Sequence, residues 1–379
     1  MIKSTEYLSR EDAFLVLNGM QGVGPVMMRR LLEKFNENPV SVLHSSESEL
    51  MSVKGVGKKA TSGIRGWRDG NWLELERDRI AKHGARFITV EDGDYPQALH
   101  EMFDPPIGLY CQGTPTREPC VAIVGTRQPT LYGQNMARRI ASGIANSGFC
   151  IVSGMARGID AAAHEGALEA SGRTVAVFGC GLDVIYPPEH LNLYRRIVET
   201  GAVVSEFPFG RRADRQTFPM RNRLVAGMCV GVVVVESSAV GGSMITARFA
   251  GEQGRQVFAV PGRADQPTAV GCHKLIREGA TLVTHAEQVI EEVAPSLGLS
   301  WNASLSVGDS DASSGKPAPD NLSSGESTVY ACLNDGSILT SDSLCERTSL
   351  PVHEVAAALT MLELKRLVSR CPDGSFEVR

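Results

Sequence analysis

The 379-residue sequence has no long hydrophobic run, and this absence argues against one class of protein. No stretch of about 18 apolar residues occurs, so a membrane span is not expected. The opening MIKSTEYLSRED also lacks the apolar segment of a signal peptide. We therefore expect a cytoplasmic protein with no membrane partner, and the length predicts two or three domains.

The nine cysteines include no C-x-x-C pair, which is a common spacing in zinc and redox sites. Most of them stand in apolar runs, which favours reduced, buried thiols. Two nucleotide motifs are missing as well. A G-x-G-x-x-G turn is replaced by GTRQPT, and no G-x-x-x-x-G-K-[ST] stretch exists. We expect no metal, no NAD or FAD and no ATP-hydrolysing P-loop.

The net charge of −5 gives no overall basic signature, so a nucleic-acid surface would have to be local. One local bias is strong: residues 105–295 contain 17 Arg but one Lys. Arginine suits planar, bidentate phosphate contacts and stacking on bases better than lysine does. The bias therefore favours specific anion contacts over diffuse attraction.

Short apolar segments in the middle of the chain predict a doubly wound, mainly parallel α/β sheet. They are rich in β-branched residues and separated by segments of helical period, a pattern typical of strands covered on both faces. The predicted strands are 121–125, 149–154, 174–179, 202–206, 230–236, 256–260 and 281–284. In such sheets ligands bind beyond the carboxyl ends of the strands, so the turns that follow them should carry function.

Glycine, hydroxyl and arginine residues gather in those turns. The turn sequences are GTRQPTLYG, SGMARGIDAAAH, GCGLDVIYPPEH, EFPFGRRADRQTFPMRNR and SSAVGGSMITA. Glycine leading into a helix leaves the first amides open to an anion. Each feature alone is usually an ordinary turn or a solvated side chain, but together they favour an anion-binding domain.

Asp160 and His164 stand four residues apart on one predicted helix face. Such a spacing is compatible with a catalytic pair. We favour the interpretation that they fix the start of the helix.

The motifs VAIVGTRQPTLYG, IVSGMARGIDAAAH, VAVFGCGLDVIYPPEH, FPMRNRLVAG and VVVVESSAVGGSMITARFAGEQGRQVFAVPG occur in this order. In this they resemble the family of DNA-processing protein A, also called DprA or Smf. The resemblance implies an extended Rossmann-like core that binds single-stranded DNA, protects incoming DNA and loads RecA onto it during natural transformation. It also implies a homodimer with no catalytic residue or cofactor. RecA is the expected partner, and single-strand-binding protein is a further candidate.

Carried over by position, the resemblance places the DNA site in four segments. These contribute Gly125, Thr126 and Arg127; Ser153, Gly154, Arg157 and Gly158; Arg215, Phe218, Arg221, Asn222 and Arg223; and Gly241, Gly242, Ser243 and Thr246. Arg215 and Arg221 would meet phosphates, and Phe218 would stack on a base. The amides of Gly242 and Ser243 and the hydroxyl of Thr246 would hold another phosphate. The sequence departs from many relatives at Arg215, where lysine is common, and at His273, where asparagine is common.

Residues 1–85 carry a repeated glycine pattern, in MQGVGPVMMRRL (20–31) and VKGVGKKATSGI (53–64). It predicts tandem helix-hairpin-helix units, whose glycine amides can face duplex phosphates beside Lys58 and Lys59. The family resemblance instead implies a small helical, SAM-like accessory domain. DNA contact and simple packing both remain open for this segment.

The remaining domain boundaries follow composition. We predict the Rossmann-like domain over 86–298, a flexible Ser/Gly/Pro-rich linker over 299–325 and a winged-helix domain over 326–379. The last segment has five Arg or Lys against eight Asp or Glu, so a protein contact is as compatible with it as DNA-groove recognition.

Two other classes fit a Rossmann-like chain. A nucleotide phosphoribohydrolase would carry P-G-G-x-G-T-x-x-E, but here the stretch reads VGGSMITARFAGE, with Phe249 three residues after Thr246. The glutamate expected to assist glycosidic cleavage is therefore absent. The second alternative is a structural adaptor that uses its arginine-rich turns for protein contacts.

Overall fold

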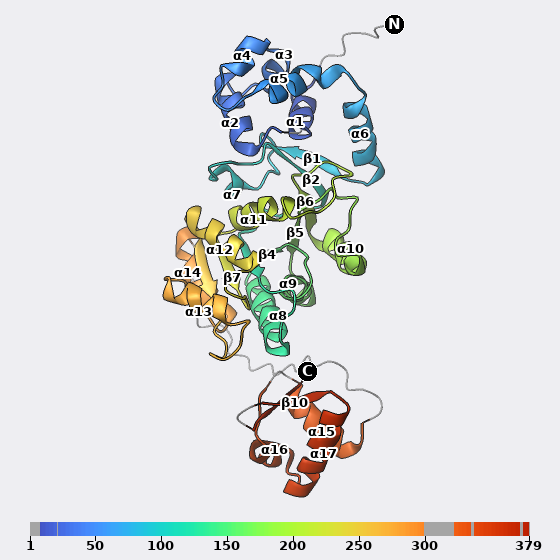
Figure 1. The fold of residues 1–379 in the computed structure, drawn as a ribbon, viewed down its shortest axis with the longest axis vertical. Helices are drawn as coiled ribbons and strands as arrows, with labels where there is room; N and C mark the ends of the chain where they lie inside the picture. The colour runs from blue at the N-terminus through green and yellow to red at the C-terminus, as the bar shows by residue number, and fades with distance from the viewer. Residues whose placement is uncertain (1–7, 21, 299–321, 335–336, 372–373, 379) are drawn as a thin grey trace.

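The computed structural model describes residues 8–20, 22–298, 322–334, 337–371 and 374–378. Figure 1 shows a group of helices near the N-terminus, a central sheet with helices on both faces, and a small C-terminal unit. Most of the predicted flexible linker, residues 299–321, lies outside the described residues. Among the described helices, none is both long and apolar enough to cross a membrane.

The central sheet has nine strands in the order β1-β2-β6-β5-β4-β3-β7-β8-β9. Its parallel part consists of β3 (Cys120–Val124), β4 (Cys150–Ser153), β5 (Thr174–Phe178), β6 (Ala202–Ser205), β7 (Gly231–Val234), β8 (Gln256–Ala259) and β9 (Thr281–Leu282). All seven strands predicted from the sequence are confirmed. The chain leaves β3 toward β4 on one side and returns as β7 on the other, which places a topological switch point between β3 and β7.

Two further strands extend the sheet and were not predicted. They are β1 (Arg86–Thr89) and β2 (Gly108–Gly113), which pair with each other in antiparallel fashion. Strand β2 also pairs antiparallel with β6, so the edge beyond β6 runs against the rest of the sheet. The sheet is thus mainly parallel with an antiparallel edge.

Helices cover both faces of the sheet. One face carries α8 (Leu131–Asn146), α9 (Ile159–Glu169) and α14 (Ala286–Val293). The other face carries α11 (Thr217–Gly227), α12 (Gly242–Glu252) and α13 (Val270–Arg277). Helix α10 (Leu191–Thr200) lies beside β6. In β3, Val121 packs with Ile140 on one side, and its neighbour Ala122 packs with Leu224 on the other. Strands β3 to β7 are buried on both faces, and their successive side chains alternate between the two helix layers.

The N-terminal segment is helical, as predicted. The helices are α1 (Arg10–Asn18), α2 (Pro25–Lys34), α3 (Pro39–His44), α4 (Glu47–Met51), α5 (Lys58–Arg65) and α6 (Trp72–Lys82), followed after β1 by α7 (Gln97–His100). Helices α2 and α5 begin after Gly24 and Gly57, and neither has a side-chain cap. The Arg30 guanidinium on α2 donates a 3.0 Å hydrogen bond to the Lys54 carbonyl in the second hairpin loop. This bond joins α2 to the loop before α5, while the paired hairpins and their contact with DNA stay predictions.

The C-terminal unit has the element order of a winged helix. It consists of α15 (Ser324–Leu333), α16 (Ser341–Thr348), α17 (Val352–Leu364) and the antiparallel strands β10 (Val368–Arg370) and β11 (Phe376–Val378). Its own apolar core contains Val329, Leu344 and Val355. The first helix begins before the predicted boundary at 326, and residues 372–373 of the predicted PDG turn lie outside the described residues.

Candidate nucleic-acid interface

Helix α11 carries the centre of the predicted site. Phe218, Arg221 and Asn222 stand at positions i, i+3 and i+4, so they share one helix face. Asn222 Nδ2 donates a 3.1 Å hydrogen bond to the Gly242 carbonyl at the start of α12. This contact joins α11 to the glycine turn that follows β7.

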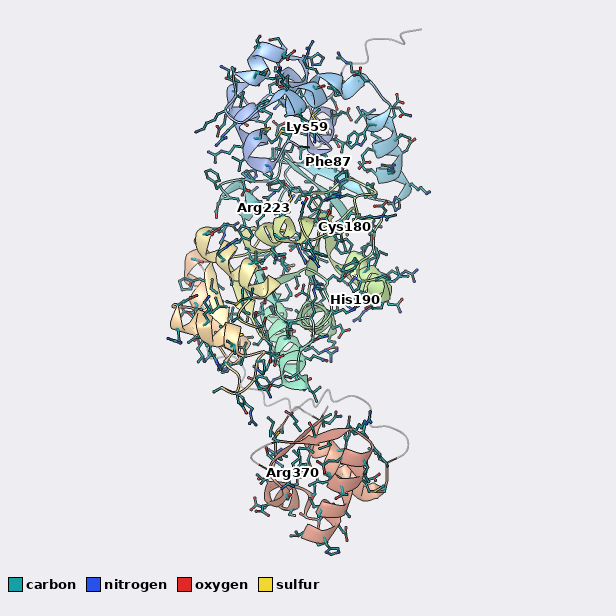
Figure 2. All side chains as sticks on the ribbon, in the orientation of Figure 1. Lys59, Phe87, Cys180, His190, Arg223 and Arg370 are labelled. Carbon is teal, nitrogen blue, oxygen red and sulfur yellow. The ribbon has the colours of Figure 1, made fainter. Side chains whose placement is uncertain are left out.

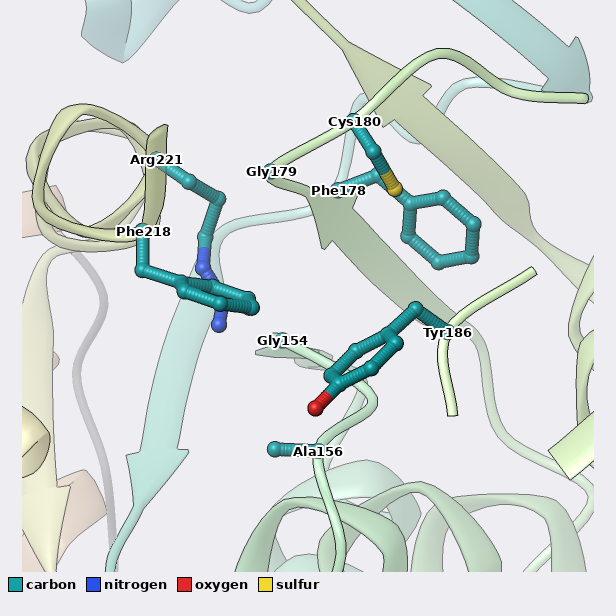
Figure 3. Close-up of a pocket in the computed structure, with 8 residues that line it drawn as sticks. All are labelled: Gly154, Ala156, Phe178, Gly179, Cys180, Tyr186, Phe218 and Arg221. Carbon is teal, nitrogen blue, oxygen red and sulfur yellow. The ribbon is translucent and has the colours of Figure 1, made fainter. Parts of the chain in front are cut away.

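A narrow pocket lies between α11 and the turns after β4 and β5 (Figure 3). It is lined by Gly154, Ala156, Phe178, Gly179, Cys180, Tyr186, Phe218 and Arg221. Most of this lining is apolar or backbone, and Arg221 contributes the one guanidinium. Phe218 and Tyr186 lie with their ring centroids 5.8 Å apart and their planes inclined at 50°. The pocket therefore combines aromatic walls with a single buried cation.

Arg221 is held inside the fold with part of its hydrogen-bonding capacity unused. The residue is 6% exposed, and its Nη1 donates a 3.0 Å hydrogen bond to the Val177 carbonyl. Its Nε has no partner within the described residues. Burial lowers the pKa of the guanidinium, and the carboxylate of Asp160 opposes that shift. A buried donor without an acceptor is costly, so an acceptor from a ligand would be favourable here.

Asp160 fixes the loop that faces Arg221. Its Oδ2 accepts hydrogen bonds from the backbone amides of Gly154 at 3.2 Å and Ala156 at 3.4 Å. A β-carbon at Gly154 would lie 1.3 Å from Arg221 Nη1, so only glycine fits there. Burial raises the pKa of Asp160, and Arg221 opposes this rise. The carboxylate thus has a structural role, but it holds the loop before α9, and no side chain caps the start of the helix.

His164 is engaged separately, through a 2.6 Å hydrogen bond between its Nδ1 and the Thr174 hydroxyl. Burial lowers the pKa of this imidazole to about 3, so it is neutral near pH 7. Asp160 and His164 each have their own structural partner, which favours the packing interpretation of this pair over a catalytic one.

The GTR turn meets both α11 and the loop after β4. The Arg127 guanidinium carbon lies 5.2 Å from the centroid of the Phe218 ring, a cation–π distance. Gly158 has φ +80°, and a β-carbon there would lie 2.4 Å from the Thr126 carbonyl oxygen. The structure therefore brings three of the four predicted segments together around Phe218 and Arg221, and the fourth contacts α11 through Asn222.

Two further predicted arginines lie on the surface. Arg157 forms an ion pair with Glu189, and both side chains are about half exposed. Arg215 is exposed and makes no hydrogen bond or ion pair within the described part of the chain. A phosphate would reach Arg215 freely, whereas at Arg157 it would compete with the Glu189 carboxylate.

Arg223 points away from this cluster, although the sequence placed it in the site. Figure 2 marks the position of Arg223. The residue is 4% exposed; its Nη2 donates a 2.6 Å hydrogen bond to Glu206, and its Nη1 donates a 2.7 Å bond to the Asp104 carbonyl. Two residues along a helix turn the side chain by about 200°, so Arg221 and Arg223 cannot face the same way. We leave Arg223 out of the candidate interface.

Several predicted hydroxyls also make internal hydrogen bonds. Ser153 donates to the Ile123 carbonyl at 2.7 Å, Ser243 to the Ser237 hydroxyl at 2.8 Å, and Thr246 to the Gly242 carbonyl at 3.4 Å. All three residues are buried. Helix α12 begins after Gly241 without a side-chain cap, so its first amides remain available to an anion. The three hydroxyls are already engaged in internal hydrogen bonds.

Tyr186 is the residue that the sequence reasoning missed. It lies in the turn between β5 and the short 3-10 helix Pro188–His190, and it lines the pocket opposite α11. The sequence did contain a pattern that points to Tyr186: the turn GCGLDVIYPPEH follows a predicted strand, and Tyr186 is its one tyrosine, phenylalanine or tryptophan.

Two family models match the chain. The model described as DNA recombination-mediator protein A covers residues 86–294, and that of the DprA winged helix domain covers residues 313–374. The chain belongs to the DprA/Smf family. Protein Smf of Synechocystis sp. is 33% identical over 398 residues, which cover 98% of this chain and 99% of that protein. The DNA processing protein DprA of Bacillus subtilis is 40% identical over 215 residues, which cover 56% of this chain and 72% of that protein.

Two solved structures extend the likeness. DNA processing protein A from Streptococcus pneumoniae superimposes with a TM-score of 0.64 at 31% identity, covering 76% of this chain and 99% of that one. DNA processing protein A from Helicobacter pylori, whose solved structure concerns its single-stranded DNA binding mode, gives a TM-score of 0.50 at 31% identity. The match covers 56% of this chain and 97% of that one. The Rossmann-like fold and the winged-helix unit agree with this family.

Proposed function

We propose that the chain is a recombination mediator that binds single-stranded DNA through the turns around helix α11 and catalyses no reaction. The observation that carries this proposal is the convergence of Arg127, Phe218 and Arg221 at the carboxyl ends of the parallel strands. Cations beside an aromatic ring suit a single strand, which offers both a phosphate and an unpaired base. The single-stranded DNA binding mode described for the Helicobacter pylori relative supports the same ligand class.

Single-strand binding should be selective and strongly dependent on salt. We expect the full chain to bind an oligothymidine more tightly than a duplex of equal length, because bases in a duplex are stacked and cannot reach the Phe218 ring. Affinity should fall steeply between low and high salt, since arginines displace counterions from phosphates. Fluorescence anisotropy at two salt concentrations measures both effects.

Equal affinity for the duplex, or binding that salt does not change, would contradict this proposal. Release of free base from nucleoside monophosphates by the purified chain would support the phosphoribohydrolase alternative instead. The structure gives that alternative little support: Phe249 occupies the position of the expected glutamate, and Glu236 accepts hydrogen bonds from the Thr130 amide and hydroxyl. If the purified chain bound no nucleic acid, that result would favour the alternative of a structural adaptor.

The finer part of the proposal is that a homodimer protects incoming DNA and loads RecA onto it during natural transformation. Support for self-association comes from α13 and β9, where Val270 is 43% and Leu282 is 46% exposed. A neighbouring groove of about 790 Å³ lies between α12 and α13, with Leu275 and Val257 in its lining. Apolar surface of this kind is typical of a protein contact.

RecA loading is expected to depend on the chain when single-strand-binding protein already covers the DNA. We expect RecA filaments to assemble faster on such DNA when the chain is added, because a mediator holds bare single strand for the recombinase. The RecA ATPase activity is measured with and without the chain. The mass of the chain in solution is measured separately by sedimentation. No acceleration would remove RecA loading from the proposal, and a monomer at all concentrations would remove the dimer.

A further inference from the structure

We propose that Glu236 is a positioning residue, which holds the GTR turn (residues 125–130) in the shape that presents Arg127 to a phosphate of the single strand. The inference rests on the proposed single-strand binding and adds to it a residue that acts through its hydrogen bonds to the protein. Glu236 lies outside the segments in which the sequence placed the site. It follows β7, the strand that pairs with β3 at the switch point of the sheet.

Glu236 binds the turn at both ends. Its backbone carbonyl accepts a 2.6 Å hydrogen bond from the Thr126 amide, which continues the ladder between β3 and β7 beyond the two strands. Its carboxylate accepts two hydrogen bonds from Thr130, at 2.9 Å from the amide and 2.6 Å from the hydroxyl. Residues 127–129 therefore lie between two points that are both fixed by one residue.

The chain approaches Glu236 closely at two glycines. Glu236 is 6% exposed. A β-carbon at Gly133 would lie 2.4 Å from its Oε2, and a β-carbon at Gly125 would lie 2.8 Å from its carbonyl oxygen. The contacts of Glu236 with both ends of the turn thus require glycine on either side of it.

Arg127 depends on this support because few contacts fix its own side chain. It is exposed, and within the described residues it makes no hydrogen bond or ion pair. Its guanidinium carbon lies 5.2 Å from the centroid of the Phe218 ring, a contact that leaves its N–H donors free for a phosphate. The backbone of the turn therefore sets where the guanidinium lies, and Glu236 sets the backbone.

The charge of Glu236 separates a positioning role from a purely electrostatic one. A carboxylate near an anion site repels phosphate, so its neutralisation would strengthen DNA binding if charge alone mattered. Thr130 presents two donors, and a carboxylate supplies an acceptor for each, whereas an amide supplies one acceptor and one donor. Loss of the second acceptor would loosen the turn and weaken binding. The two roles thus predict opposite signs for Glu236→Gln.

The test measures the affinity of the full chain for a labelled oligothymidine by fluorescence anisotropy. Glu236→Gln should weaken binding about fivefold, because Arg127 loses its fixed place. In an Arg127→Ala background the same change should alter affinity less than about twofold, since no guanidinium remains to be positioned. The slope of affinity against salt should become shallower, as in Arg127→Ala, because a phosphate contact is lost. A role confined to fold stability would weaken binding equally in both backgrounds.

The matched control is Glu189→Gln, the same substitution at another carboxylate. Glu189 pairs with Arg157, and its side chain is 49% exposed, so its neutralisation should free that guanidinium and strengthen binding. If Glu236→Gln also strengthens binding, leaves it unchanged, or weakens it equally in both backgrounds, the positioning role is wrong while single-strand binding stands. If the parent chain does not bind the oligothymidine in a salt-dependent way, the proposed function itself fails.

A second pair of variants tests the same hydrogen bond from Thr130, in case Glu236→Gln does not fold. The Thr130 hydroxyl donates to Glu236 and accepts a 3.1 Å hydrogen bond from the Gly133 amide at the start of α8. Thr130→Ser keeps this hydroxyl and should bind like the parent chain. Thr130→Val removes it and should weaken binding about fivefold, again only while Arg127 is present. Circular dichroism checks that both fold, and a Thr130→Val chain that binds like the parent would overturn the proposal.

Discussion

Arg127→Ala is expected to lower single-strand affinity tenfold to hundredfold. Arg127 is exposed in the turn after β3, at the switch point of the sheet, and its guanidinium lies over the Phe218 ring. A charge-assisted contact to phosphate is worth roughly 1.5–3 kcal/mol, and about 1.4 kcal/mol corresponds to a tenfold change. Titration of a labelled oligonucleotide measures the loss.

The matched variant is Arg366→Ala in the C-terminal unit. Arg366 is exposed and lies in a segment where acidic residues outnumber basic ones, so its removal should change affinity several-fold at most. Circular dichroism should show that both variants fold. Equal losses, or a loss confined to Arg366→Ala, would move the DNA site to the C-terminal unit.

Arg223→Met should destabilise the fold by about 3–5 kcal/mol without a specific effect on DNA affinity. The Arg223 and Glu206 side chains are 5% and 11% exposed, and burial raises the pKa of Glu206 while Arg223 opposes this. Removal of the cation leaves a buried carboxylate without its partner, which is among the most costly single changes. The measurement is urea unfolding followed by circular dichroism.

Two comparisons make the result specific. Arg248→Met removes an exposed cation that pairs with Glu252 on α12, and it should cost less than about 1 kcal/mol. The double variant Arg223→Met with Glu206→Gln should recover part of the stability, because the buried Glu206 charge is removed and only the Asp104 carboxylate, which is 26% exposed, loses its partner. A stable Arg223→Met chain with weakened DNA binding would return Arg223 to the interface.

The inner parallel strands, β3 to β7, were predictable because each is a short apolar run buried on both faces. Alternating residues such as Val121 and Ala122 contact opposite helix layers, so the local composition already specifies the environment. Strands β1 and β2 gave a weaker signal: RFIT begins with an exposed arginine, and GLYCQG has a glycine at each end and a glutamine near its end. They become strands by pairing with each other and with β6, which is distant in sequence.

The sequence alone determined where the candidate site lies, since glycine and arginine after parallel strands must gather at one edge of the sheet. Only the tertiary structure decided which side chains face it. The helical turn of α11 directs Arg221 into the pocket and Arg223 toward Glu206, and the turn after β5 brings Tyr186 against Phe218. These choices depend on contacts between segments far apart in the chain, and no local pattern encodes such contacts.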